Sequence, residues 1–187
     1  MGNDMDFDRI RPLFGGRLTS SQVEGINAIL AAVDGLPLAH RAYLLATAFH
    51  ETAQTMQPIT ERGARAYFDK YEPGTAIGRR LGNTRAGDGY LFRGRGYVQI
   101  TGRTNYAKAG AALGIDLIAN PDAALRRPIA ARIMVLGSCE GWFTTRKLDD
   151  YLLSRPPDYR SARRVINGTD RAEMIAGYAW SFERALK

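Results

Sequence analysis

A long irregular stretch in the middle of the chain most constrains what the sequence can fold into. Residues 56–92 have no sustained hydrophobic period, and glycine or proline interrupts them repeatedly. Only short helices around residues 64–71 and 76–81 are indicated within them. Because such stretches inside compact domains are usually functional, we expect this one to form a wall of a ligand site.

Helical patterns precede and follow the irregular stretch. A capping box at Ser21–Glu24 predicts the start of one helix, and the apolar spacing of residues 38–52 predicts the next. Asn120-Pro121-Asp122 is typical of a helix start. Without a repeat or a linker, residues 1–187 are predicted to form a single catalytic domain, with residues 1–37 as its N-terminal helical extension. Further helices are expected at residues 105–113, 128–142, 147–153, 160–166 and 170–186.

Composition limits the partners. One cysteine and two histidines predict neither a disulfide nor a metal site, and no cofactor motif is seen. Because no apolar run approaches the ~20 residues of a membrane span, we expect no stable membrane insertion. The net charge of +7 favours a polyanionic partner, but no helix-turn-helix pattern suggests nucleic acid. Arg160, Arg163 and Arg164 fit a solvated helix face as well as a binding patch.

Paired carboxylates are the first candidate for chemistry. Glu51 lies at the edge of the apolar face of the helix expected at residues 38–52, where partial burial favours a protonated acid. Its neighbour His50 points about 100° away around the helix, which suits an orienting role. Glycosidic hydrolysis commonly needs a second carboxyl group, and Glu61 and Glu72 are both available in the irregular stretch.

A glycine-rich segment supplies the second candidate group. After Gly94-Arg95-Gly96, residues 97–101 are expected to form a short strand that places Gln99 and Thr101 on one side. Asn105 and Asn167 fit either helix caps or ligand contacts. Uncharged hydrogen-bonding groups and nearby tyrosines suggest a sugar site. These tyrosines are Tyr67, Tyr71, Tyr90 and Tyr97.

Taken in order, these motifs resemble glycoside hydrolase family 19, and within it the phage and prophage endolysins more than the plant chitinases. The resemblance spans residues 38–185 and implies a mainly α, lysozyme-like, two-lobed helical domain. A small β-element would line its cleft, and the enzyme would hydrolyse β-1,4 bonds with inversion of the anomeric configuration. The matching segments are His50-Glu51-Thr52, Gly94–Thr101, Asn105-Tyr106, Asn120-Pro121-Asp122 and Ile166-Asn167-Gly168.

The resemblance also implies a role for each site residue. Glu51 would be the general acid, and Thr101 would hold the attacking water. A base about ten residues beyond the acid, as in the endolysins, selects Glu61, whereas plant-chitinase spacing selects Glu72 as the alternative. We prefer Glu61, because Met56–Thr60 looks endolysin-like. The substrate-binding residues would be His50, Tyr97, Gln99, Asn105 and Asn167.

Three functions compete at this point. The leading hypothesis is an endolysin, a muramidase that hydrolyses bacterial peptidoglycan, because the wall is anionic and chitin is nearly neutral. The alternatives are a chitinase acting on β-1,4 N-acetylglucosamine polymers and a non-catalytic cell-wall-binding module. We expect a monomer. The absence of a signal sequence predicts that it accumulates in the host bacterial cytoplasm and needs a holin to reach the wall.

Overall fold

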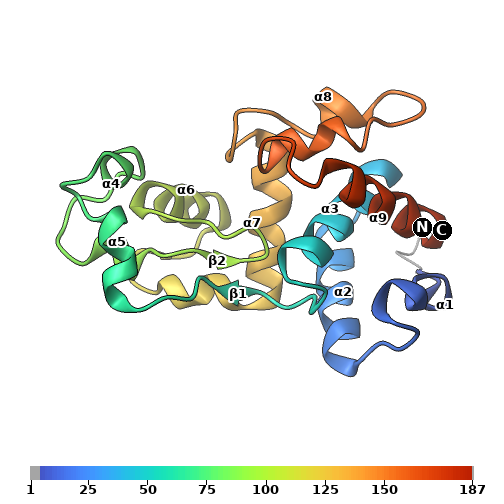
Figure 1. Ribbon diagram of the computed structural model, residues 1–187, viewed down its shortest axis with the longest axis horizontal. Coiled ribbons are helices and arrows are strands. Elements are labelled where there is room, and N and C mark those ends of the chain that lie inside the picture. The colour runs from blue at the N-terminus through green and yellow to red at the C-terminus, as the bar shows by residue number, and fades with distance from the viewer. Residues whose placement is uncertain (1–4, 187) are drawn as a thin grey trace. The chain divides into compact units, whose positions relative to one another are not determined.

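Helices dominate the computed structural model, which describes residues 5–186 and includes a small two-stranded sheet (Figure 1). The mainly α fold class is therefore confirmed. Residues 1–4 of the expected N-terminal extension lie outside the described range. The elements are α1 (Phe7–Ile10), η1 (Arg11–Phe14), α2 (Ser20–Ala32), α3 (Leu38–Glu51), β1 (Ile59–Thr60), η2 (Arg65–Tyr71), α4 (Ala76–Arg80), α5 (Asp88–Leu91), β2 (Arg95–Gly96), α6 (Arg103–Leu113), η3 (Pro121–Leu125), α7 (Arg127–Glu140), α8 (Asp149–Leu152), η4 (Ser161–Val165) and α9 (Ala172–Ala185), where η marks a 3-10 helix.

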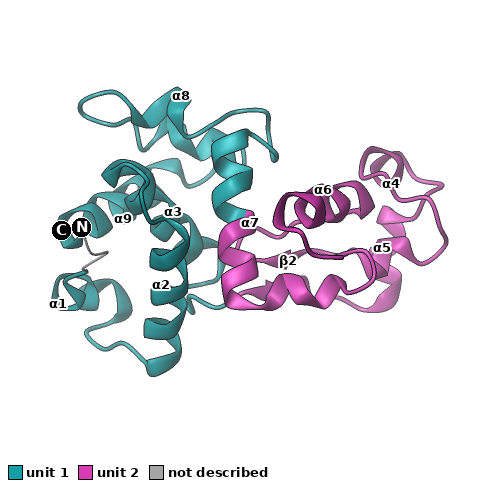
Figure 2. Cartoon of the chain, turned by 180° about the vertical axis from the view of Figure 1, so that it is seen from behind, with its two compact units in different colours: residues 1–57, 134–187 teal, residues 58–133 magenta. Residues whose placement is uncertain are grey.

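The chain divides into two compact units, coloured separately in Figure 2. Unit 1 comprises residues 1–57 and 134–187, and unit 2 comprises residues 58–133. Helix α7 contributes residues to both units. The grouping of all residues into one catalytic domain stays a prediction.

Unit 1 is built around the packing of α3 against α9 (Figure 1). Phe49 of α3 makes edge-on ring contacts with Phe14, Tyr178 and Phe182, at centroid distances of 4.9, 4.8 and 6.0 Å. Such aromatic pairs add to the stabilisation that burial provides. The two ends of the described chain meet here, because the backbone N–H of Asp6 donates to the carbonyl of Ala185 over 2.8 Å. Both chain ends thus close the same helical core.

Helix α2 begins earlier than expected. The capping box is formed by Thr19 and Gln22, not by Ser21–Glu24. The Thr19 hydroxyl accepts from the Gln22 N–H at 3.2 Å, and the Gln22 carbonyl oxygen accepts from the Thr19 N–H at 2.8 Å. Gln22 also donates to the carbonyl of Gln54 at 3.1 Å. This added tie to the loop after α3 explains why the earlier of two possible boxes forms.

In unit 2, β1 and β2 pair antiparallel, with Ile59 opposite Gly96. The prediction of a strand at residues 97–101 is wrong. The chain instead turns back, so that Ile100 and Arg95 exchange backbone hydrogen bonds of 3.0 and 3.2 Å. Gln99 adopts a left-handed φ of 55° inside this turn, which breaks the alternation that a strand requires.

Arg95, the arginine of the Gly-Arg-Gly turn, has a structural role in unit 2. Its side chain is 3% exposed. It donates to Asp122 at 2.8 Å, to the Tyr106 hydroxyl at 2.9 Å and to the carbonyl of Leu91 at 2.9 Å. One buried guanidinium therefore connects β2 with η3, α6 and α5, and its charge is paired as a buried charge must be.

The remaining helices largely follow the sequence patterns. The short segments expected near residues 64–71 and 76–81 form η2 and α4, whereas α5 was not expected. Asn120 precedes η3 but makes no side-chain cap, so the expected helix start is a 3-10 turn instead. Within residues 5–186, no helix is long and apolar enough to span a bilayer.

Candidate active site

The predicted site residues form two groups, one in each unit. Each group is held by its own hydrogen bonds. Unit 1 contains His50, Glu51 and Asn167. Unit 2 contains Glu61, Glu72, Tyr97, Gln99, Thr101 and Asn105.

Glu51 is the last residue of α3, and its side chain is 23% exposed. The Nη1 atom of Arg163 donates to its Oε1 atom over 2.5 Å. Arg163 is only 3% exposed, and its Nε atom also donates to the carbonyl of Asp170 at 3.1 Å. This buried guanidinium fixes the orientation of the carboxylate. In the described part of the chain, Oε2 of Glu51 makes no hydrogen bond and is the oxygen left for a ligand.

Sequence reasoning missed Arg163 as a partner of Glu51. Among the three neighbouring arginines, only Arg163 is buried, while Arg160 and Arg164 are exposed. The solvated-face interpretation therefore fails for Arg163. No local signal could have found this pair, because Arg163 lies 112 positions from Glu51 in the sequence.

His50 and Asn167 complete the unit 1 group. His50 is half-buried and lines a cavity of about 290 Å³ with Arg171 and Tyr178. Burial lowers the pKa of His50, against the Glu51 charge that raises it. Asn167 is exposed, and its Oδ1 atom accepts from the Gly168 N–H at 2.9 Å. Asn167 therefore shapes a turn at the surface, while its role as a sugar ligand stays a prediction.

Glu61 follows β1 and is half-buried. The Tyr71 hydroxyl donates to its Oε1 atom at 3.0 Å, and the Gly94 N–H donates to its Oε2 atom at 3.1 Å. Burial raises the pKa of Tyr71, and the hydrogen bond to Glu61 and the charge of Glu61 raise it further. The hydroxyl therefore remains a donor at neutral pH. The two donors orient both carboxylate oxygens. Tyr71 was expected only as one of several clustered aromatic residues.

The structure explains why the first residue of the Gly94-Arg95-Gly96 motif is a glycine. A Cβ atom at this position would lie 2.8 Å from Oε1 of Gln99 and 3.2 Å from Oε2 of Glu61. Any side chain would therefore push on both polar groups. The missing Cβ allows the Glu61 carboxylate and the Gln99 amide to sit together beside the backbone.

Gln99, Thr101 and Asn105 form a chain of hydrogen bonds next to Glu61. Gln99 donates to the carbonyls of Ile59 and Gly96 at 2.8 and 3.0 Å. The Thr101 hydroxyl donates to the Gln99 carbonyl at 2.9 Å, and Asn105 donates to the Thr101 carbonyl at 2.7 Å. Strand alternation is not what brings these residues together. Their remaining acceptor oxygens are suited to binding a water or a sugar hydroxyl.

Glu72 and Tyr97 are engaged in holding the fold. The two oxygens of Glu72 accept from the N–H groups of Gly87 at 2.8 Å and Gly89 at 3.1 Å, so the carboxylate holds the start of α5. Tyr97 is 0% exposed, and its burial raises its pKa to about 12. This burial does not favour a contact between Tyr97 and a substrate, and the expected binding role of Tyr97 stays a prediction. Among residues 5–186, no group of three or more His, Cys, Asp or Glu side chains could hold a metal ion.

The mainly helical fold with a minimal sheet is shared with solved structures. Chitinase C from Streptomyces griseus has this fold, with a TM-score of 0.69 and 20% identity over 99% of this chain and 77% of that chain. The family model for glycoside hydrolase family 19, described as chitinase class I, matches residues 41–147. Because this match covers more than half of the sequence, the chain belongs to glycoside hydrolase family 19.

Curated relatives agree with this membership. Chitinase 11 of rice, Oryza sativa subsp. japonica, is 34% identical over 109 residues, which cover 46% of this chain and 43% of the relative. A glycosyl hydrolase family 19 domain-containing protein of Haemophilus influenzae is 52% identical over 40 residues, or 20% of each chain. The chain thus spans less than half the length of the curated relatives it matches.

Proposed function

We propose that this protein is a glycoside hydrolase that cleaves β-1,4 bonds in polysaccharides of N-acetylated amino sugars. The observation that carries the proposal is the pair of half-buried glutamates, Glu51 and Glu61, each oriented by hydrogen-bond donors. Both lie inside the region matched by the family 19 model.

The proposed reaction is an inverting hydrolysis by general acid and general base. Glu51, protonated for this step on Oε2, the oxygen that does not accept from Arg163, gives its proton to the glycosidic oxygen as the bond from that oxygen to the anomeric carbon breaks. Glu61 takes a proton from a water molecule as the water oxygen bonds to the anomeric carbon from the opposite face. Inverting enzymes place their carboxyls ~6.5–9.5 Å apart to admit this water. Thr101 and Gln99 are proposed to orient the water.

Glu61 is a better candidate for the base than Glu72. A general base needs an oxygen that a water molecule can approach. Both oxygens of Glu72 accept from backbone N–H groups that hold the start of α5. Glu61 accepts from one backbone N–H and from the Tyr71 hydroxyl, a side chain that can move, and its carboxylate lies beside the Gln99 amide at Gly94. These contacts support the shorter acid-to-base spacing in this chain.

Chitin is the better supported substrate, because the plant relatives are chitinases by name. Peptidoglycan, the leading hypothesis from the sequence, becomes the second candidate. One observation favours it, the net charge of +7, which draws the protein toward an anionic wall. Membership in the endolysin branch, a monomeric state, action after release from a host cytoplasm and dependence on a holin stay predictions.

Two substrates tested side by side decide between these functions. Soluble chito-oligosaccharides released from chitin are measured next to turbidity loss of purified bacterial walls, with Glu51→Gln as the inactive control. Release from chitin that this substitution abolishes supports the chitinase. Lysis of walls alone favours the muramidase. Binding to either polymer without hydrolysis returns the protein to the class of wall-binding modules and overturns the proposal.

A further inference from the structure

Two buried hydroxyl groups lie on the side of α3 that carries Glu51. Tyr43, Thr47 and Glu51 follow one another at intervals of four residues, so their side chains lie along the same side of the helix. A helical side chain leans toward the turn that precedes it, which brings the Glu51 carboxylate toward Thr47. Tyr43 and Thr47 are each 1% exposed. The two hydroxyls therefore lie in the interior of unit 1, in line with the candidate acid.

Within residues 5–186, neither hydroxyl makes a hydrogen bond of ordinary geometry. The Thr47 hydroxyl acts on Tyr43 as a nearby polar group, and the Tyr43 ring stacks on the ring of Tyr159 at a centroid distance of 6.1 Å. Burial raises the pKa of Tyr43, so its hydroxyl stays neutral at working pH. Because an unsatisfied buried polar group costs free energy, and most such groups are hydrogen-bonded, these two exceptions call for an explanation.

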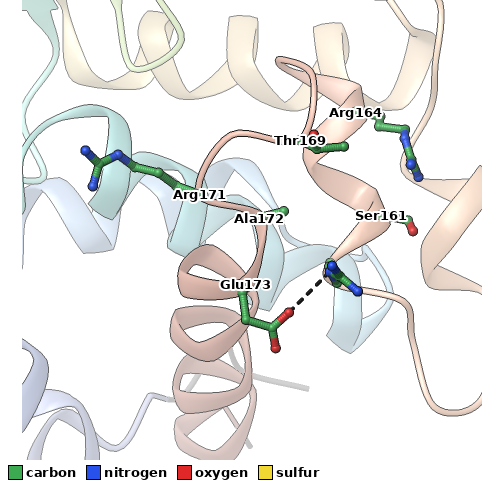
Figure 3. Close-up of a pocket in the computed structure, with 7 residues that line it drawn as sticks. Ser161, Arg164, Thr169, Arg171, Ala172 and Glu173 are labelled. Carbon is green, nitrogen blue, oxygen red and sulfur yellow. Dashed lines mark ion pairs between the residues drawn. The ribbon is translucent and has the colours of Figure 1, made fainter.

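The Arg163 guanidinium is a buried donor near these hydroxyls. Its charge acts on Tyr43 more strongly than the charge of Glu51 does. Arg163 is 3% exposed, whereas Arg164, the next residue of η4, lines a cavity of about 500 Å³ beside the start of α9 (Figure 3). In the described part of the chain, the Arg163 side chain makes two hydrogen bonds, to Glu51 and to the carbonyl of Asp170. Because a guanidinium has five N–H donors, Arg163 has further donors that an interior acceptor could engage.

The pair of Glu51 and Arg163 poses a difficulty for general acid catalysis. Glu51 must hold a proton before it can give one to the glycosidic oxygen, but a neighbouring guanidinium favours the charged form of a carboxyl group. Protonating Glu51 also leaves Arg163 as a buried charge without its counter-ion, which is costly. A group that accepts from Arg163 in that state would reduce this cost and favour the protonated acid.

We propose that the hydroxyl oxygens of Thr47 and Tyr43 accept hydrogen bonds from Arg163 when Glu51 is protonated. The inference rests on the proposed function, in which Glu51 is the acid. Both residues are positioning residues that act on Glu51 through Arg163. Because their oxygens make no hydrogen bond while Arg163 pairs with Glu51, and hydroxyls can accept as well as donate, they stabilise only the protonated state. They therefore keep more of Glu51 protonated at neutral pH than the ion pair alone would allow.

Removing an uncharged hydroxyl leaves the charged groups around Glu51 in place. These groups belong to α3, to η4 and to the other elements packed against α3. They are His50 of α3, Arg163 of η4, Asp170 and Arg171 in the turn before α9, Glu183 of α9 and Glu24 of α2. A change in the titration of Glu51 on substitution of Thr47 or Tyr43 therefore reports on the hydroxyl and not on a lost charge.

A carboxyl titration tests the inference without requiring hydrolysis. The titration midpoint of Glu51 is followed by ¹³C NMR of the whole protein in Thr47→Val, which removes the hydroxyl and keeps the shape, and in Tyr43→Phe. Both substitutions should move the midpoint to lower pH, by about one unit in Thr47→Val, because one hydrogen bond to a charged group is worth about a tenfold change in the protonation equilibrium. Thr47→Ser, which keeps a hydroxyl, should keep the unsubstituted midpoint. The matched control Ser138→Ala removes a buried hydroxyl of α7 that also makes no hydrogen bond within residues 5–186, and it should leave the midpoint in place.

The pH dependence of kcat on chito-oligosaccharides should show the same effect. A general acid loses activity as the pH rises through its titration midpoint. The alkaline limb should therefore move to lower pH by about one unit in Thr47→Val and stay in place in Ser138→Ala, while the limiting kcat changes little. Tm at neutral pH should not fall in Thr47→Val or Tyr43→Phe, because a hydroxyl that makes no hydrogen bond adds no stability through one.

Four results separate this role from a purely structural one. An unchanged Glu51 midpoint in both Thr47→Val and Tyr43→Phe, or an equal shift in Ser138→Ala, would overturn the inference. A fall in Tm would show that the hydroxyls are already bonded in the resting protein and would also overturn it. A loss of rate at every pH, with an unmoved alkaline limb, would mean a packing effect alone and refute the role. If the midpoint moves as expected but no polymer is hydrolysed, the inference about Arg163 stands and the proposed function fails.

Discussion

Replacing Glu72 and Glu61 separately by glutamine should separate a structural glutamate from a catalytic one. In the unsubstituted protein, the N–H groups of Gly87 and Gly89 donate to the two oxygens of Glu72 at 2.8 and 3.1 Å. In Glu72→Gln, one of these oxygens becomes an NH₂ group, which cannot accept from the N–H that faces it. Losing this acceptor in a half-buried place costs about 2 kcal/mol. For a protein of this length, each kcal/mol lowers Tm by roughly 2–4 °C, so a drop of roughly 4–8 °C is expected.

Glu61→Gln should behave in the opposite way. Its partners are the Gly94 N–H and the Tyr71 hydroxyl, and a tyrosine hydroxyl can accept from an amide as well as donate. The glutamine carbonyl can keep the Gly94 hydrogen bond, so Tm should fall by less than about 4 °C, for at most ~1 kcal/mol. The rate of hydrolysis should fall by ~10²–10⁴-fold, because no proton acceptor remains.

Thermal unfolding and initial rates on the same two variants are the assay. An inactive but fully stable Glu72→Gln, beside an active Glu61→Gln, would refute this reasoning and assign the base to the longer spacing. Equal losses of stability in both variants would also contradict it, because Glu72 accepts from two backbone N–H groups and Glu61 from one.

Three further substitutions follow from the contacts. Glu51→Gln should abolish hydrolysis and also lower Tm, because Arg163 is 3% exposed and loses its counter-ion; an unchanged Tm would show that the pair contributes little. Thr101→Val should lower turnover with a Tm loss of only about 2–4 °C, for one hydrogen bond of ~1 kcal/mol; an unchanged rate would remove it from the mechanism. Burial opposes the charge of Asp88, but hydrogen bonds from Arg103 and backbone N–H groups outweigh it and lower its pKa from 3.8 to about 2. Because a lowered folded pKa contributes stability that is lost as the pH falls from about 4 to about 2, Asp88→Asn should flatten the pH dependence of Tm there.

Helical periodicity predicted most of the fold. The helix expected at residues 105–113 is α6, closed by Gly114 in a left-handed conformation with φ of 67°. α3 ends at Glu51, one residue before the predicted end. Both depend on local signals, namely apolar spacing and a glycine stop, that are readable without tertiary contacts.

The segment after Gly94-Arg95-Gly96 could not be predicted as easily. β-Branched residues and alternation favoured a strand, but Gln99 adopts a positive φ because its side chain bridges the carbonyls of Ile59 and Gly96. Ile59 lies 40 positions away in sequence. A local pattern cannot contain that partner, and tertiary contacts overrode the propensity.

The candidate site likewise combines features that local sequence predicts with contacts that it does not. Residue type and position selected Glu51 and left Glu61 and Glu72 open as the second carboxylate, and the family resemblance preferred Glu61. The hydrogen-bond donors of Glu51 and Glu61 come from distant segments. Arg163 is 112 positions from Glu51, and the Gly94 N–H is 33 positions from Glu61. Tyr97 was expected at the ligand surface because aromatic residues often bind sugars, yet its burial depends on packing that composition does not reveal.

The stereochemistry of the first product tests the central claim most directly. Hydrolysis of an N-acetylglucosamine hexamer is followed by ¹H NMR of the anomeric protons, faster than mutarotation, with Glu51→Gln as the control. The account predicts that the α-anomer appears first with the unsubstituted protein and that no product forms with the control. Initial formation of the β-anomer, or undiminished hydrolysis by Glu51→Gln, would contradict it.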